Sequence, residues 1–310
     1  MQRTTPTSLS GKLVVVHGER RAQRSLQRLL GTTLCPVEVV PDLASATIDS
    51  DTIVVIDAAI ALTALDACKR SARAWIAVPG EGLHPADPMV VSALLHAGWD
   101  HVVAHPMPLL SEELLATAQK LLRRDCFGLD KYMVWGSEVR GFTLEDAVER
   151  DAVVSAIASD VTRVGLPDRI GSLVSVIADE LLANALYAAP IDDSGVKHRV
   201  HDPRDRTRLL NGRDVVTLRW STDGRYLAIE VRDRWGTIQP AAIETRLAAT
   251  KTANAEGGMG LPLAYACSNQ LVVNLAPGAL TEVIALLDIR YKPTELARSA
   301  SFHAFWGDPP

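Results

Sequence analysis

Short, mostly aliphatic runs recur through the first 124 residues, and each is followed by a segment whose apolar side chains have helical spacing. The runs are LVVV (13–16), VEVV (37–40), TIVVID (52–57), AWIAV (74–78) and HVVA (101–104). Strands that are buried on both faces of a sheet have this continuous apolar character. Repeated β–α units therefore predict an α/β, doubly wound, five-stranded parallel sheet over residues 11–124, preceded by a disordered N-terminus at 1–10.

The second half of the chain has a different order of elements. Helical patterns at 146–163 and 169–188 are followed by a polar loop, and then by two hairpins whose turns lie at 222–224 and 277–278. Helices followed by antiparallel strands predict an α+β two-layer sandwich over residues 151–292.

Two aromatic-containing segments flank this second region. Residues 125–150 hold four aromatic side chains and are interpreted as a packed linker, with a dimer or partner surface as the alternative. In the tail, 293–310, Phe302, Phe305 and Trp306 have helical spacing, and we interpret the tail as a docked strand or helix, with a partner-binding or self-association segment as the alternative.

Charge and cysteine usage narrow the classes of function. The net charge is −5, and neither the first 124 residues nor the remainder is basic, so nucleic acid is a poor default partner. The four cysteines form no CxxC pair, which suits a reducing compartment. Without a signal peptide or an uninterrupted run of ~18 apolar residues, we expect a cytoplasmic protein that does not span a membrane.

The first chemically suggestive motif is ADELLANALYAA at 178–189. Glu180 and Asn184 are four residues apart and therefore share one helix face. The carboxylate can accept a proton from an attacking water or hydroxyl, and the amide oxygen can ligate Mg²⁺.

Two further motifs follow in the same region. In VRDRWG (231–236), Asp233 ends a strand and can accept a hydrogen bond from an exocyclic amine. In EGGMGLPLAYA (256–266), a glycine cluster precedes a helix, an arrangement that offers backbone N–H groups to phosphate.

In their order and α+β context, these motifs resemble those of the GHKL ATPase superfamily, whose members include histidine kinases, gyrase and anti-sigma serine kinases. The resemblance covers residues 150–290 and implies a GHKL (Bergerat) ATPase fold that binds ATP and Mg²⁺. The implied site residues are Glu180 as general base, Asn184 as Mg²⁺ ligand, Asp233 as adenine-binding carboxylate, Gly236, Gly258 and Gly260 as nucleotide-contacting glycines, and Lys251 in a mobile lid.

The sequence departs from this family in two places. Trp235 and Thr237 stand where the family pattern Asp-x-Gly-x-Gly has glycines, so the bulk of Trp235 either narrows the adenine pocket or stacks against it. Residues 125–177 contain no histidine, so the phosphoacceptor helix of histidine kinases is missing and the resemblance is nearest to the anti-sigma serine-kinase branch.

The β–α pattern of 11–124 resembles a response-regulator receiver domain with an altered acid pocket. Asp57 ends the third strand and matches the phosphoacceptor position. His17-Gly18 stands in place of the carboxylate pair, and His105-Pro106 stands in place of Lys-Pro. The resemblance therefore implies a pseudo-receiver that serves for docking or dimerisation.

Together these features favour a bacterial-type signal-transduction protein that binds Mg-ATP and acts as a protein Ser/Thr kinase or a slow ATPase. Its partners would be ATP and a signalling protein that carries the modified Ser or Thr, and a homodimer is left open. The alternative is a non-catalytic scaffold that acts through protein–protein interaction.

Overall fold

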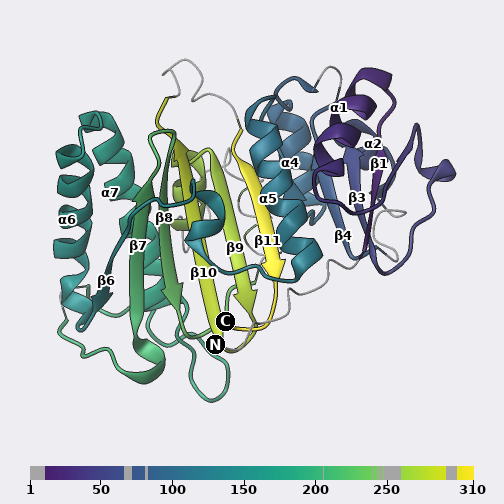
Figure 1. Ribbon diagram of the computed structural model, residues 1–310. Coiled ribbons are helices and arrows are strands. Elements are labelled where there is room, and N and C mark those ends of the chain that lie inside the picture. Colours follow the sequence, from purple (N-terminus) through teal and green to yellow (C-terminus); the bar gives the residue numbers. More distant parts are fainter. Residues whose placement is uncertain are drawn as a thin grey trace, which may run out of the picture. The chain divides into compact units, whose positions relative to one another are not determined.

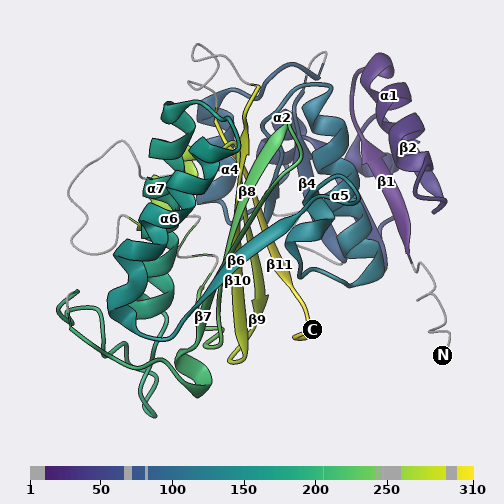
Figure 2. The ribbon, with the colours of Figure 1, turned by 60° about the vertical axis from the view of Figure 1, so that its left-hand side comes forward.

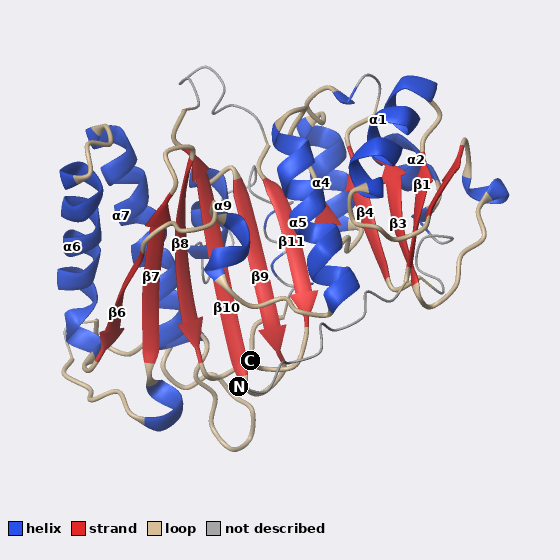
Figure 3. Ribbon diagram, in the orientation of Figure 1, coloured by secondary structure: helices blue, strands red, loops and turns tan. Residues whose placement is uncertain are grey.

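The chain forms two compact units, Met1–Cys126 and Phe127–Pro310. The computed structural model describes residues 11–65, 72–80, 83–204, 206–239, 241, 243, 247, 260–290 and 299–310. Figures 1 and 3 show the elements of each unit, with helices and strands distinguished by colour in Figure 3.

The first unit contains a parallel sheet with the strand order β2-β1-β3-β4-β5. Its strands are β1 (Lys12–Val16), β2 (Val37–Val40), β3 (Thr52–Asp57), β4 (Ala74–Val78) and β5 (His101–Val102). Its helices include α1 (Arg20–Gly31), α2 (Ala58–Thr63), α4 (Pro88–His96) and α5 (Leu109–Arg123). The parallel sheet expected from the aliphatic runs is thus confirmed.

Burial on both faces explains the continuous aliphatic runs of this sheet. Leu13 and Val15 belong to a core cluster with side chains of α1 and α5, whereas Val14, between them in sequence, is also fully buried. Of the helix expected near 60–70, the structure shows α2, which ends at Thr63, and residues 66–71 lie outside the described residues.

The second unit contains a mixed sheet with the strand order β11-β9-β10-β8-β7-β6. Its strands are β6 (Val139–Leu144), β7 (Val216–Thr222), β8 (Tyr226–Asp233), β9 (Gln270–Ala276), β10 (Leu280–Asp288) and β11 (Ser301–Trp306). β11 pairs in parallel with β9, and the other pairs are antiparallel. Both hairpins expected from the turn residues are present.

A helical layer covers one face of this sheet. It includes α6 (Arg150–Arg163), α7 (Asp168–Ala183) and α9 (Gly260–Cys267), with α7 packed against both of the others. Figure 2 shows α6 and α7 side by side along the sheet. The helix expected at 239–249 falls mostly outside the described residues.

Both flanking segments contribute strands to this sheet. Residues 125–150, interpreted from the sequence as a linker, contain the edge strand β6, which pairs with β7. The described part of the tail contains β11, so the interpretation as a docked strand is confirmed and the helical spacing of its aromatic residues does not correspond to a helix. Phe302 and Phe305 are both buried, which a strand covered on two faces permits.

Buried carboxylates attach the start of this unit to its sheet. Glu282 of β10 accepts hydrogen bonds from the Gly128 N–H (2.9 Å) and the Asn274 amide (2.6 Å), and it forms an ion pair with Arg232. Glu230 of β8 forms ion pairs with Arg219 and Arg232, and burial raises its pKa to about 7. Because charges with no exposure require such partners, this network fixes residues near 128 against the strands.

One helical stretch, Asp168–Ala188, is long and apolar enough to cross a membrane by length and composition alone. However, 56% of its most apolar window is buried inside the protein, as for a core helix. Its apolar side chains are therefore explained by packing within the second unit.

Candidate functional site

Glu180 and Asn184 lie at the end of α7, where the helix changes its geometry. The regular α-helix ends at Ala183, and Asn184–Ala188 form a π-helical turn in which the Ala189 N–H donates to the Asn184 carbonyl (2.8 Å). π-helical turns occur frequently at functional sites. The predicted carboxylate and carboxamide therefore occupy a locally distorted end of a core helix.

The Glu180 and Asn184 side chains are half-buried. Among the described residues, neither side chain has a hydrogen bond or an ion pair. Burial, followed by the charge of Asp179, raises the pKa of Glu180, while Arg204 and Arg150 act in the opposite direction. A carboxylate with a raised pKa and free oxygens suits proton acceptance near neutral pH.

Gly260 brings the third motif against the first. It is the first residue of α9, and a Cβ atom placed on it would lie 2.7 Å from Oε2 of Glu180. A larger residue at position 260 would have to displace the Glu180 side chain. The structure thus places Glu180 beside the N-terminus of α9, where backbone N–H groups point outward.

Asp233 is buried at the end of β8 and organises the turn that follows. Its Oδ1 accepts the backbone N–H groups of Trp235 (2.8 Å) and Gly236 (3.3 Å). Burial raises the pKa of Asp233 to about 6, although these two hydrogen bonds act to lower it. The Thr237 hydroxyl then donates to the Ala189 carbonyl (2.6 Å), which ties this turn to the end of the α7 π-turn.

Gly236 is enclosed by the β9–β10 turn. Its φ is +60°, and an added Cβ would lie 2.3 Å from the Ala276 carbonyl oxygen and 2.6 Å from the Ala279 nitrogen. Only glycine fits this conformation and this backbone approach. Gly236 lies one residue after the first glycine of the pattern Asp-x-Gly-x-Gly. The packing of the β9–β10 turn against it therefore explains why this position is a glycine.

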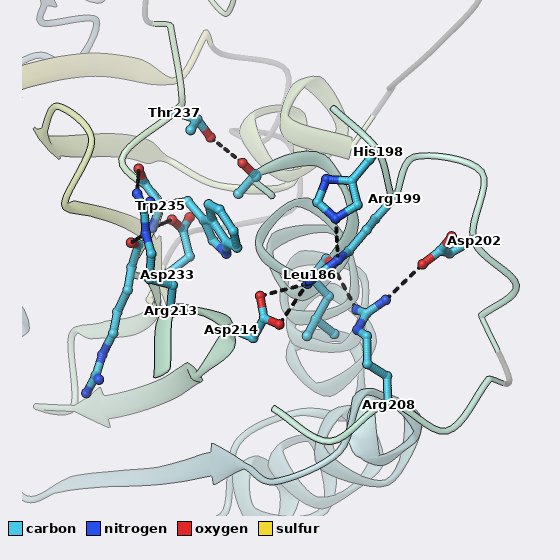
Figure 4. A network of polar contacts seen from close by, with 12 residues as sticks. Leu186, His198, Arg199, Asp202, Arg208, Arg213, Asp214, Asp233, Trp235 and Thr237 are labelled. Carbon is cyan, nitrogen blue, oxygen red and sulfur yellow. Dashed lines mark hydrogen bonds and ion pairs between the residues drawn. The ribbon is translucent and has the colours of Figure 1, made fainter. Parts of the chain in front are cut away.

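Trp235 is buried, and the side chains of Arg199 and Arg213 lie near its indole ring; Figure 4 labels all three residues. The guanidinium carbon of Arg213 lies 4.6 Å from the centroid of the indole, and that of Arg199 lies 5.8 Å from it. Arg213 also donates to the carbonyls of Trp235 (3.4 Å) and Gly278 (2.8 Å). Trp235 therefore stacks within the protein itself in the described structure.

The described residues of the polar loop expected at 191–213 form ion pairs of their own. Arg199 forms a bidentate pair with Asp214 (2.7 and 3.0 Å), and Arg208 pairs with Asp202 (3.1 Å) and donates to the Leu186 carbonyl (3.1 Å). Figure 4 shows these contacts around the end of α7. The sequence analysis missed this role, although five arginines within 199–213 were a signal of it.

Thr281 is a further residue that the sequence analysis missed. It lies directly opposite Asp233 in the β8–β10 register and is itself buried. Only the strand pairing reveals this neighbour, because the two residues are 48 positions apart in the chain.

Two predicted site residues, Lys251 and Gly258, lie outside the described residues. The other predicted positions of the second unit form two neighbouring groups. Glu180, Asn184 and Gly260 make the first group, and Asp233 with Gly236 makes the second.

In the first unit, Asp57 is enclosed at the end of β3. Its Oδ1 caps α2 by accepting the N–H groups of Ala59 (2.7 Å) and Ile60 (3.3 Å). Its Oδ2 lies 3.5 Å from Nε2 of the buried His17, and a Cβ on Gly80 would lie 3.2 Å from the same oxygen. Both carboxylate oxygens therefore have protein neighbours.

His105, at the position of the receiver lysine, is also buried. Its Nδ1 lies 2.9 Å from the Glu113 carboxylate, which is buried with it. Within the described ranges, no group of three His, Cys, Asp or Glu residues could hold a metal ion.

Comparison with protein-family models gives no match for this chain, and comparison with curated proteins gives no match either. The fold and site define an α/β protein with a mixed sheet, whose second unit groups a carboxylate, a carboxamide and a helix N-terminus.

Proposed function

We propose that the second unit is a GHKL-type domain that binds Mg-ATP, within a signalling protein whose first unit is receiver-like. The observation that carries the proposal is the pairing of Glu180 and Asn184 on one helical face, without partners among the described residues, beside the first residue of α9. Because these side chains are only half-buried and hold no protein partner among the described residues, their oxygens are accessible to a ligand.

Each side chain has a role that follows from its chemistry. The Asn184 carboxamide supplies one oxygen ligand for magnesium, and the remaining ligands would be phosphate oxygens and water. Magnesium bound with the nucleotide neutralises charge that develops on the phosphates. Glu180 accepts the proton of the attacking water or of a partner's Ser or Thr hydroxyl, and its raised pKa suits that task.

The adenine ring of the nucleotide would bind near Asp233. This carboxylate is buried, and the backbone N–H groups of the following turn hold its Oδ1. Its orientation is thus set before any ligand arrives, which lowers the cost of recognising an exocyclic amine.

Calorimetric titration with Mg-ATP tests the binding part of this proposal. We expect the wild-type protein to bind and Asn184→Ala to lose the magnesium-dependent affinity, while Ser172→Ala, on an exposed position of the same helix, binds as the wild type does. Glu180→Gln should retain binding and lose turnover, measured as phosphate release or transfer. Turnover at the wild-type rate in Glu180→Gln would refute the assignment of Glu180 as the general base.

A second candidate function is a non-catalytic scaffold, and the burial of Trp235 beneath Arg199 and Arg213 favours it. Because the Trp235 indole already stacks against side chains of the protein, it does not require the adenine of a nucleotide to cover it. Absence of Mg-ATP binding by the folded wild-type protein would support this candidate over the first.

For the first unit, we propose a docking or dimerisation role without phosphorylation. The support is the enclosure of Asp57, whose Oδ1 caps α2 and whose Oδ2 faces His17. Phosphorylation would require that carboxylate to leave its cap.

A further inference from the structure

Four arginines of the segment 199–213 lie over two buried aromatic rings. Arg199 and Arg213 lie over Trp235, whereas Arg204 and Arg208 lie over Tyr187. The guanidinium carbon of Arg204 is the nearest of the four to a ring, at 4.4 Å from the Tyr187 centroid. Stacking of this kind restrains a long cationic side chain without using its N–H donors.

Arg204 differs from the other three in what its donors do. Arg199 and Arg208 are paired with carboxylates, and Arg213 donates to backbone carbonyls. Arg204 is exposed, and within the described part of the chain its guanidinium has neither an ion pair nor a hydrogen bond. Its five donors are therefore held in place by the ring and remain available to an anion.

The position of Arg204 is set by Tyr187. The Tyr187 hydroxyl donates to the Arg204 carbonyl (3.4 Å), so the backbone and the side chain of Arg204 both contact this tyrosine. Tyr187 is buried in the π-helical turn that begins at Asn184. The positive charge of Arg204 also acts to lower the pKa of Glu180, which lies seven residues before Tyr187. Arg204 therefore contacts the same π-helical turn that begins at Asn184.

From this placement we propose that Arg204 binds the terminal phosphates of the nucleotide and that the site selects a polyphosphate ligand. The inference rests on the proposed function of the second unit and names the group that would hold the negative end of its ligand. An arginine fork matches phosphate oxygens in bidentate geometry, and its restraint over Tyr187 reduces the entropy lost on binding.

The test is calorimetric titration of the full chain with Mg-ATP and, separately, with AMP. Arg204→Gln should weaken Mg-ATP binding by about ten- to hundredfold, the range for loss of a charge-assisted contact. Binding of AMP should be unchanged, because AMP lacks the terminal phosphates. Arg204→Lys should recover part of the Mg-ATP affinity, since it keeps the charge and loses the fork.

Arg206→Gln is the matched control, because Arg206 is exposed on the same segment and covers no ring in the described structure. It should bind Mg-ATP within about twofold of the wild type, an effect expected of a screened surface charge. Equal weakening of Mg-ATP and AMP by Arg204→Gln would overturn the inference, since it would indicate loss of the segment's structure.

Two other results separate the inference from the proposed function. Wild-type affinity for Mg-ATP in Arg204→Gln would overturn the inference and leave the proposed function standing. No binding of Mg-ATP by the wild-type protein would overturn both.

Discussion

Gly236→Ala should destabilise the second unit because of where an added methyl group would lie. The Cβ would approach backbone atoms on the β9–β10 turn, at 2.3 Å from the Ala276 oxygen and 2.7 Å from the Gly278 nitrogen. Backbone atoms of a hydrogen-bonded turn cannot move away as the end of a side chain can, and the Gly278 N–H donates to the Gly236 carbonyl (3.0 Å). The turn and the strand end must therefore separate.

The magnitude follows from two contributions. An alanine at φ +60° costs about 1–2 kcal/mol, and forcing a methyl group into a closely packed site costs about 1–3 kcal/mol more. We therefore expect Gly236→Ala to lower the free energy of unfolding by about 2–5 kcal/mol.

Gly224→Ala is the matched control for the conformational contribution. Gly224 has φ +80° in the β7–β8 turn, and an added Cβ would meet no atom within 4 Å. This variant should lose only about 1–2 kcal/mol. Urea unfolding of both variants and the wild type, followed by circular dichroism, measures the difference, and equal losses in the two variants would refute the close approach at Gly236.

Two further predictions concern ionisable groups. Because burial raises the pKa of Asp233 from 3.8 to about 6, the protonated form is favoured in the folded state. The stability of the wild-type protein relative to Asp233→Asn should therefore be greatest below pH ~4 and fall, by on the order of 3 kcal/mol, as pH rises through ~6. If the unfolding free energies of the two proteins changed with pH by the same amount from pH 4 to 7, that result would contradict the raised pKa of Asp233. For Asp57, we expect no phosphate incorporation from acetyl phosphate by intact mass, and a loss of about 1 kcal/mol in Asp57→Ala because the cap of α2 is removed. Phosphate incorporation that disappears in Asp57→Ala would contradict the docking role of the first unit.

Several elements could be predicted from the sequence because their signals are local. The aliphatic runs of β1 and β3 reflect burial on both faces, and the Asp-Gly turn at 223–224 reflects the geometry of a tight hairpin. The spacing of Glu180 and Asn184 also determines locally that they share a helix face. These predictions needed no knowledge of distant residues.

The outer strands of the second sheet could not be predicted in this way. β6 is an edge strand with mostly exposed or half-buried residues, so it has no aliphatic run. β11 pairs with β9 only after the chain returns from the end of β10, and its aromatic residues fit helical and extended spacing alike. For such segments the partner strand decides the structure, because the backbone hydrogen bonds and the burial both come from it.

From the sequence alone we could predict the parallel strands of the first unit, the two hairpins of the second unit and the types of side chain available for chemistry. The packing of the folded chain was needed to show which residues meet: Gly260 with Glu180, Thr281 with Asp233, and Arg204 with Tyr187. The physical reason is that helix and strand periodicity acts over a few residues, whereas these contacts depend on how the sheet pairs and how α7 packs on it. The segment 199–213 illustrates this, since its composition predicts a polar loop, whereas its described arginines form ion pairs and lie over Tyr187 and Trp235.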